Sequence, residues 1–330
     1  MKHILITTLL CTGLFSGLCS AQSIERTSSD IIPTQLESMY VKGLRFLANS
    51  QLSNGSWGDN SGNYPGVVGL AILAFLAHGE DPNHGPYAEN IKRSIDYLIK
   101  NQKTTNGYIG TSMYNHGFAT LALAESYGTL HDERLEGALT KAVDLILSAQ
   151  KANTKGGWRY GPDSKDADTT VSGCQIVALL AARNAGIPVP DKAIEKGLAY
   201  MSSCRSSSGT YGYTSKNGGK PTLTAIGSLC FSLAKQKDAP GYKKSLEHLK
   251  KKLEYRDTHY TYYFEYYMSQ ALFQADEETW KLWNEKNTSL LSVTQQGNGS
   301  WNGNRGPTYS TASALLSTAL NYRFLPIYEK

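Results

Sequence analysis

The segment "QLSNGSW" (residues 51–57) returns near the other end of the chain as "QQGNGSW" (295–301), with five of seven letters unchanged. Each copy has a glutamine, a glycine four residues later and a tryptophan two residues after that. "KAVDLILSAQKANTKGGW" (141–158) is a third copy, and weaker copies end at residues 109 and 211. The glutamines stand at 51, 102, 150 and 295, Arg205 takes the same place in another copy, and a further copy near 243–255 is eroded. A fixed period of about fifty residues indicates stacked structural units.

Every unit has the same internal order. An amphipathic helical pattern such as 36–51 precedes the glutamine, and a loop rich in Gly, Asn and Ser follows it. A second helical run then comes that is apolar nearly all round: 64–79, 114–128, 169–186, 221–235, 260–274 and 309–322. An amphipathic helix beside an apolar one indicates an outer helix that shields an inner helix. We therefore predict an all-α protein, an (α/α)6 toroid of six outer and inner helix pairs.

The repeated residues have a structural interpretation. The glutamine ends each outer helix, where carbonyl groups lack partners within the helix, so its amide can donate to them or to the loop. The glycine permits a tight turn, and the tryptophan packs back over the neighbouring unit. We predict that these residues join the repeats and are not catalytic.

Composition and the chain ends limit the functional classes. Residues 1–21 combine a basic start, an apolar run and small residues at "CSA" (19–21), which is typical of a signal peptide. Residues 22–330 would then form a single secreted or periplasmic domain, with no transmembrane segment after cleavage. The formal net charge of +5 is mild and spread out, so we exclude nucleic acid as a partner. Cys174, Cys204 and Cys230 form no disulfide framework; they are predicted core residues with at most one bridge among them.

The repeats resemble the QW repeat of the terpene cyclase family, and "KGLRFLANSQLSNGSW" (42–57) fits that pattern throughout. The resemblance covers residues 36–325 and implies the toroid of squalene–hopene cyclases and protein prenyltransferase β subunits. "GGWRYGPDSKDADTTVSGCQIVAL" (156–179) is more closely similar to a group of secreted bacterial proteins with prenyltransferase and squalene-oxidase repeats.

The stretch "DADTT" (166–170) is the main candidate for chemistry. It resembles the Asp-x-Asp-Asp-Thr motif of class II terpene cyclases, in which the middle Asp protonates an alkene. The resemblance implies Asp168 as proton donor, with Asp166 beside it, although Thr169 replaces the last Asp. The alternative is that Asp168 caps the helix that follows, where amide groups and the helix dipole favour the ionised form.

Two further groups of residues are candidates. Inner helices of a ring run parallel, so His116 and Asp168 start at the same end of neighbouring helices and could form a proton-transfer pair. The alternative is a structural His116 bonded to a nearby loop. Aromatic residues could line the ring's interior and hold an isoprenoid chain, or simply fill the core; they are Tyr114, Tyr260, Tyr263, Phe264 and Tyr267. Glu265 lies among them and needs a partner or water.

The prenyltransferase zinc site is the remaining comparison. That site uses an Asp-x-Cys pair and a distant His, but Ser172 stands where the Asp would precede Cys174. We therefore predict no metal and no cofactor.

Three functional hypotheses remain open from the sequence. The first is a secreted cyclase-like toroid that binds an apolar or isoprenoid ligand, with acid chemistry at Asp168. The second is a non-catalytic scaffold for another envelope protein. The third is a glycan-active enzyme, which needs two opposed carboxylates that the sequence does not identify.

Overall fold

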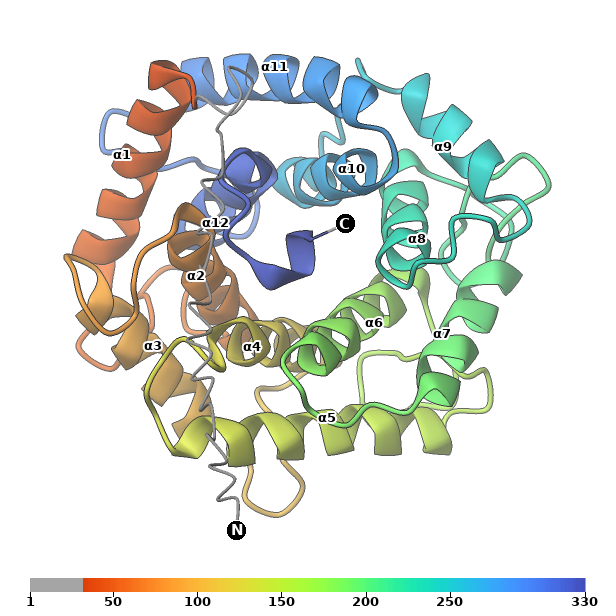
Figure 1. Ribbon diagram of the computed structural model, residues 1–330, viewed down its shortest axis with the longest axis horizontal. Coiled ribbons are helices and arrows are strands. Elements are labelled where there is room, and N and C mark those ends of the chain that lie inside the picture. The colour runs from red at the N-terminus through yellow and green to blue at the C-terminus, as the bar shows by residue number, and fades with distance from the viewer. Residues whose placement is uncertain (1–31, 330) are drawn as a thin grey trace, which may run out of the picture. The chain divides into compact units, whose positions relative to one another are not determined.

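The computed structural model describes residues 32–329, and every regular element in that range is a helix (Figure 1). The outer helices are α1 (Thr34–Ser50), α3 (Ala88–Lys100), α5 (Arg134–Ala152), α7 (Asp191–Ser203), α9 (Tyr242–Lys250) and α11 (Glu277–Thr294). The inner helices are α2 (Pro65–His78), α4 (Met113–Ser126), α6 (Thr169–Asn184), α8 (Pro221–Leu233), α10 (Thr261–Ala275) and α12 (Pro307–Thr318). Two short 3₁₀ helices follow, η2 (Ala319–Asn321) and η3 (Pro326–Tyr328). The predicted signal peptide, residues 1–21, lies outside the described residues.

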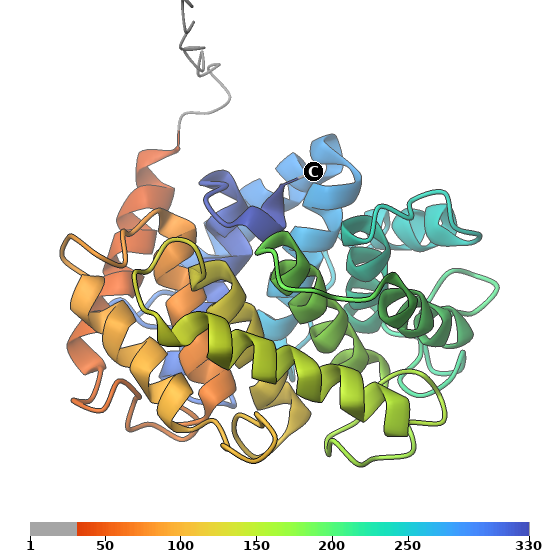
Figure 2. The same cartoon turned by 60° about the horizontal axis from the view of Figure 1, so that its bottom comes forward.

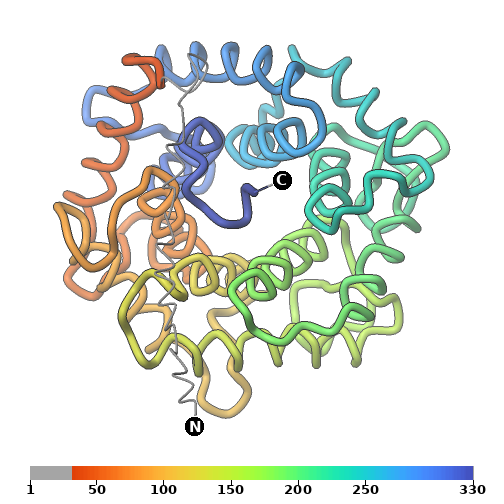
Figure 3. The backbone as a smooth tube through the Cα atoms, viewed as in Figure 1, coloured from red at the N-terminus to blue at the C-terminus, as the bar shows by residue number. Residues whose placement is uncertain are grey.

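The helices of residues 32–329 form two concentric rings (Figures 1 and 3). Each inner helix packs against its two inner neighbours, and α12 packs against α2, so the inner ring closes. The predicted all-α (α/α)6 toroid is confirmed. Within the range that the structure describes, no helix is long and apolar enough to span a membrane.

Burial explains why the two kinds of helix sort into two rings. Outer helix α3 buries Ile91, Ile95 and Leu98 along one side and leaves its charged residues in water. Inner helix α2 buries every residue from Pro65 to Ala77 because it is covered on all sides. A side chain at Gly69 would place a Cβ only 2.6 Å from the Phe118 carbonyl oxygen. Glycine there therefore permits the close contact between α2 and α4.

The repeated glutamines join each unit to the next, and we call these joints latches. Each side-chain amide donates to a carbonyl in its own loop and to a carbonyl of the next outer helix. The pairs are Gln51 with Gly55 (3.2 Å) and Asn90 (3.0 Å), Gln102 with Gly107 (3.1 Å) and Ala138 (2.8 Å), Gln150 with Gly156 (2.8 Å) and Ala193 (2.9 Å), and Gln295 with Gly299 (2.9 Å) and Met39 (2.9 Å). The last pair ties α11 to α1 and thus closes the outer ring.

The tryptophan of a latch bonds back to the outer helix that precedes it. Trp57, Trp158 and Trp301 are buried, and their indole N–H groups donate to Leu47, Ile146 and Leu291, respectively, at 2.8–3.0 Å. These carbonyls lie in the last two turns of an outer helix, so each tryptophan fastens its loop back onto the helix that precedes it. Arg205, which replaces the glutamine in the fourth unit, also reaches forward and donates to the Pro240 carbonyl. The substitution therefore keeps the joint between units.

The C-terminal segment closes one end of the inner ring (Figures 1 and 2). The amide of Ile327 in η3 donates to Glu125 Oε2 at 3.3 Å, and the side-chain amide of Gln274 donates to the Tyr328 carbonyl at 3.1 Å. Glu125 and Gln274 lie near the C-terminal ends of α4 and α10, so the segment covers that end of the inner helices. Any open space inside the ring is reached from the opposite end.

Candidate functional site

A cavity of about 770 Å³ lies at the N-terminal ends of the inner helices. The residues that line it come from all six inner helices or from the loops just before them. Its lining is Ser61, Tyr64, Gly66, Val67, Leu70, Thr111, Ser112, Tyr114, Asn115, Phe118, Tyr160, Thr170, Tyr213, Gly218, Lys220, Thr222, Leu223, Asp257, Tyr260, Tyr263, Arg305 and Tyr309. The volume falls within the range of about 300–1,000 Å³ that is usual for small-molecule sites.

The cavity changes character with depth. Tyrosines and other polar residues from the loops and the first helical turns surround its mouth, and Tyr64, Tyr160 and Tyr260 are exposed there. One turn deeper, the walls carry Leu70 and Phe118, which are buried and apolar. Since the inner helices run parallel, position along a helix sets depth in the cavity. The site therefore suits a molecule with an apolar body and a polar end.

The charged residues of the lining gather at the mouth. Lys220 and Arg305 are exposed. Asp257 is the one carboxylate in the lining that the structure describes, and it accepts from the Thr222 hydroxyl (2.8 Å) and from the amides of His259 (3.1 Å) and Tyr260 (2.9 Å). Burial raises its pKa, but these hydrogen bonds outweigh burial and leave the pKa lowered. Asp257 is therefore an ionised group that organises the turn before α10.

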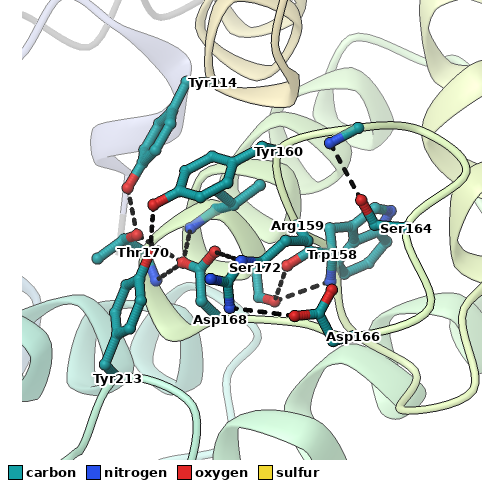
Figure 4. Close-up of polar contacts among 12 residues, drawn as sticks. Tyr114, Trp158, Arg159, Tyr160, Ser164, Asp166, Asp168, Thr170, Ser172 and Tyr213 are labelled. Carbon is teal, nitrogen blue, oxygen red and sulfur yellow. Dashed lines mark hydrogen bonds and ion pairs between the residues drawn. The ribbon is translucent and has the colours of Figure 1, made fainter.

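Asp168 is the N-cap of α6, and its side chain is fully buried (Figure 4). One carboxylate oxygen, Oδ1, accepts from the amides of Thr170 and Val171 at 2.9 Å and from the Thr170 hydroxyl at 2.6 Å. The other oxygen, Oδ2, has no hydrogen-bond partner and lies 3.6 Å from Arg159 Nε. Burial raises the pKa of Asp168, while the hydrogen bonds and Arg159 oppose that rise without cancelling it.

Asp168 lies behind the cavity wall and not in it. Thr170 belongs to the lining, Asp168 does not, and the Tyr114 hydroxyl covers Thr170 by donating to its Oγ1. Arg159 lies over the rings of Tyr160 and Tyr213, at 5.1 and 5.3 Å from their centroids, and the two tyrosine hydroxyls hydrogen-bond to each other (Figure 4). The buried carboxylate thus supports a wall of cavity residues.

His116 is not brought to Asp168. Its Nδ1 accepts from the Ile109 amide at 3.1 Å, and its Nε2 donates to the Ala142 carbonyl at 2.9 Å. This pattern requires the neutral ring, in agreement with burial, which lowers the pKa of His116 to about 4. The proposed proton-transfer pair is wrong, and the alternative of a structural His116 that fastens a loop is what the structure contains.

Asp166 also lies away from the cavity. Its side chain is 65% exposed and forms an ion pair with Arg159 at 3.4 Å on the outer side of the loop. Asp166 is not among the residues that line the cavity.

The aromatic residues of α10 divide into two groups. Tyr260 and Tyr263 line the cavity, as does Tyr114 from α4. Phe264 and Tyr267 do not, so their prediction as ligand contacts is wrong. Phe264 faces outward and meets Trp283 of α11 edge-on at 5.6 Å, while Tyr267 lies one turn deeper than Tyr263 and packs against it at 4.8 Å. Phe264 is outside the cavity because it lies on the side of α10 that faces α11. Tyr267 is outside it because it lies too deep along the helix.

Glu265 is buried among aromatic residues, as the sequence predicts, but the described structure gives its carboxyl group no hydrogen-bond partner. It is 0% exposed, and neither carboxylate oxygen has a hydrogen-bond partner in the described part of the chain. Burial raises its pKa to about 8, and Arg256 opposes that rise. Glu265 lies outside the cavity lining, so it is a buried acid in the core and not part of this site.

Four further tyrosines line the cavity that were not among the candidates from the sequence, namely Tyr64, Tyr160, Tyr213 and Tyr309. For two of these tyrosines, the repeat in the sequence contains a pattern that predicts their shared position. Tyr160 and Tyr213 each follow the aromatic residue of a latch, Trp158 or Tyr211, by two positions, and so occupy equivalent places in successive units.

The described residues contain no group of three His, Cys, Asp or Glu side chains that could hold a metal ion. Cys174, Cys204 and Cys230 are buried and unbridged.

Among known proteins, the matches to this chain are solved structures. No family model matches the sequence. No curated protein matches it either. A variant of the type II terpene cyclase MstE from Scytonema, in complex with its substrate geranylgeranyl dihydroxybenzoate, superposes with a TM-score of 0.60 at 15% identity, over 88% of this chain and 98% of that one. The GH76A alpha-1,6-mannanase from Salegentibacter sp. HEL1_6 superposes with a TM-score of 0.63 at 10% identity, over 86% and 98%. A protein from Actinoplanes gives 0.57 at 14% identity, over 87% and 99%.

These similarities establish the fold alone. A terpene cyclase and a mannanase superpose about equally well, and both identities are low. A shared fold carries many unrelated functions, so the function must be argued from the cavity.

Proposed function

We propose that this protein binds a small molecule with an apolar body, such as an isoprenoid, in the central cavity. The observation that carries the proposal is the cavity itself, about 770 Å³, closed at one end by η3 and lined with apolar residues below a rim of tyrosines. The MstE complex with geranylgeranyl dihydroxybenzoate supports it by showing that a toroid of this fold can hold a prenylated molecule.

The cavity favours binding over acid catalysis. A general acid must come within hydrogen-bond reach of the atom that it protonates, and Thr170 and Tyr114 separate Asp168 from the cavity. Glycan hydrolysis needs two carboxyl groups about 5–10 Å apart across the substrate. Among the described lining residues Asp257 alone is a carboxylate, and it caps a turn. We therefore favour a ligand carrier or sensor over either enzyme.

The proposal also includes the location of the protein. The basic and apolar pattern of residues 1–21 supports a secreted or periplasmic location. A carrier there would take up an apolar molecule outside the cytoplasm. The rival function, a scaffold for another envelope protein, predicts no binding in the cavity.

A matched pair of variants tests the proposal with farnesol as the probe. Val67 lines the cavity, whereas Val293 on α11 is 79% exposed on the outside of the ring. Isothermal titration calorimetry should detect farnesol binding to the wild type and to Val293→Trp. Val67→Trp fills the cavity and should weaken binding at least about tenfold, a loss of about 1.4 kcal/mol.

Circular dichroism must first establish that both variants keep their helix content. Absence of farnesol binding to the wild type would refute the proposal. Equal affinity in both variants would refute the cavity as the site.

A further inference from the structure

A chain of hydroxyl groups runs from the buried carboxylate to the cavity (Figure 4). The Thr170 hydroxyl contacts Asp168 Oδ1 at 2.6 Å, and the Tyr114 hydroxyl contacts Thr170 Oγ1. Tyr114 and Thr170 both line the cavity. The three groups form one line, and the direction of each hydrogen bond in it can be assigned.

Asp168 fixes that direction. Its Oδ1 already accepts two backbone N–H groups, so a proton on this carboxyl group would sit on Oδ2, which accepts no hydrogen bond from any described residue. In either protonation state Oδ1 is an acceptor, and Thr170 must donate its single hydroxyl proton to it. Thr170 Oγ1 can then only accept from Tyr114.

The Tyr114 hydroxyl is consequently an acceptor toward the cavity. It has one proton, which is committed to Thr170, and its remaining lone pair can receive a hydrogen bond from a ligand. A ligand ether or carbonyl oxygen could not supply that bond, because it has no proton to donate.

Tyr263 supplies the complementary role. Tyr263 lines the cavity, and its hydroxyl oxygen is buried without a hydrogen-bond partner in the described structure. Tyr114 and Tyr263 line the same cavity from α4 and α10, and no hydrogen bond of normal geometry joins their hydroxyls; each also affects the other's pKa. Tyr263 is therefore free to donate to a ligand oxygen beside Tyr114.

We propose that Tyr114 and Tyr263 together recognise a hydroxyl group, so that the ligand is an alcohol or a phenol. The ligand hydroxyl would donate to Tyr114 Oη and accept from Tyr263 O–H, which satisfies both tyrosines at once. This inference rests on the proposed function and names the class of ligand that the cavity takes.

The test compares the affinities for farnesol and for farnesyl methyl ether, which has no hydroxyl proton to donate. The wild type should bind farnesol about tenfold more tightly than the ether, because the ether leaves the buried acceptor Tyr114 Oη without a hydrogen bond. Tyr114→Phe should weaken farnesol binding about tenfold and leave the ether unaffected. Tyr263→Phe should weaken both ligands, because each ligand has an oxygen that accepts from Tyr263.

Tyr242→Phe is the matched control, since its hydroxyl contacts Ser232 on the outer side of α8, away from the cavity. It should leave both affinities as in the wild type. If neither ligand binds the wild type, the proposed function itself fails. If both bind but with equal affinity, or if Tyr114→Phe keeps the preference for farnesol, the hydroxyl assignment is overturned.

Discussion

Asp168 combines two roles that oppose each other in their effect on its charge. As the N-cap of α6 it receives two amide N–H groups and a hydroxyl at Oδ1, which favours the carboxylate. Its complete burial disfavours the carboxylate and prevails, so its pKa is raised. Asp168 caps the helix that carries the lining residue Thr170, so it matters more for the shape of the cavity than for a reaction in it.

Replacement of Asp168 should therefore act mainly on stability. Asp168→Ala removes the cap and leaves the Thr170 hydroxyl and two amides without an acceptor, so we expect a loss of about 2–3 kcal/mol in the free energy of unfolding. Urea denaturation at pH 7 measures this loss.

Asp166→Ala is the matched control two residues away. Its exposed side chain also pairs with Arg159, and surface ion pairs contribute little, so the change should stay within about 0.5 kcal/mol. Similar losses in the two variants would argue against the capping role of Asp168.

At the scale of the element, α10 places successive residues in three surroundings. Tyr263 faces the cavity, Phe264 faces α11, and Glu265 is buried without a partner. Successive residues of a helix are turned by about 100°, so one inner helix meets the cavity, its outer partner and its neighbours. Glu265 is the least favourable of these placements, because a buried carboxyl group must remain protonated.

Glu265 should make stability depend on pH. Its folded pKa of about 8 exceeds the ordinary Glu value of 4.5, so its contribution is fully present below pH 4.5 and is lost as pH rises to about 8. Glu265→Gln cannot ionise, and its stability relative to the wild type should rise by more than about 1 kcal/mol between pH 5 and pH 8. Urea denaturation across this range measures the difference.

Glu278→Gln on α11 is the comparison, because that side chain is 85% exposed. A relative stability for Glu265→Gln that does not change with pH would contradict the assignment of a protonated buried acid.

At the scale of the whole molecule, closure of the ring depends on contacts between the first and the last unit. Gln295 donates to Met39 across 256 positions of sequence, and α12 packs against α2. The other glutamine latches join consecutive units. Closure leaves no end of the array uncovered, which is a way for stacked repeats to avoid separate capping units.

Loss of the closing latch should loosen one place in the ring. Gln295→Ala removes two hydrogen bonds, with an expected loss of about 1–2 kcal/mol in the free energy of unfolding. Hydrogen exchange should accelerate in α1 and α11 but not in α5, on the opposite side of the ring (Figure 1).

The neighbouring Gln296→Ala is the control, because the side-chain amide of Gln296 donates to the Thr294 carbonyl within its own turn, at 3.3 Å, and joins no other unit. Uniform acceleration of exchange around the ring would contradict a local role for the Gln295 latch.

The sequence by itself determined the repeat, the pairing of outer with inner helices and the closed ring. It could do so because burial on one side or on all sides leaves a periodic pattern along each helix, and because each latch lies within a few residues of the helix that it ends. Tyr114, Tyr260 and Tyr263, which the sequence offered as candidates, line the cavity.

Only the tertiary structure decided which residues meet the cavity. Periodicity gives the angles between residues on one helix but not the absolute rotation of that helix in the ring, so Phe264 could not be separated from Tyr263. Periodicity also does not show how far along the inner helices the cavity extends, so the sequence could not place Tyr267 and Asp168 outside the cavity lining. The site is assembled from first turns and loops about fifty residues apart, and their juxtaposition exists only once six units have closed.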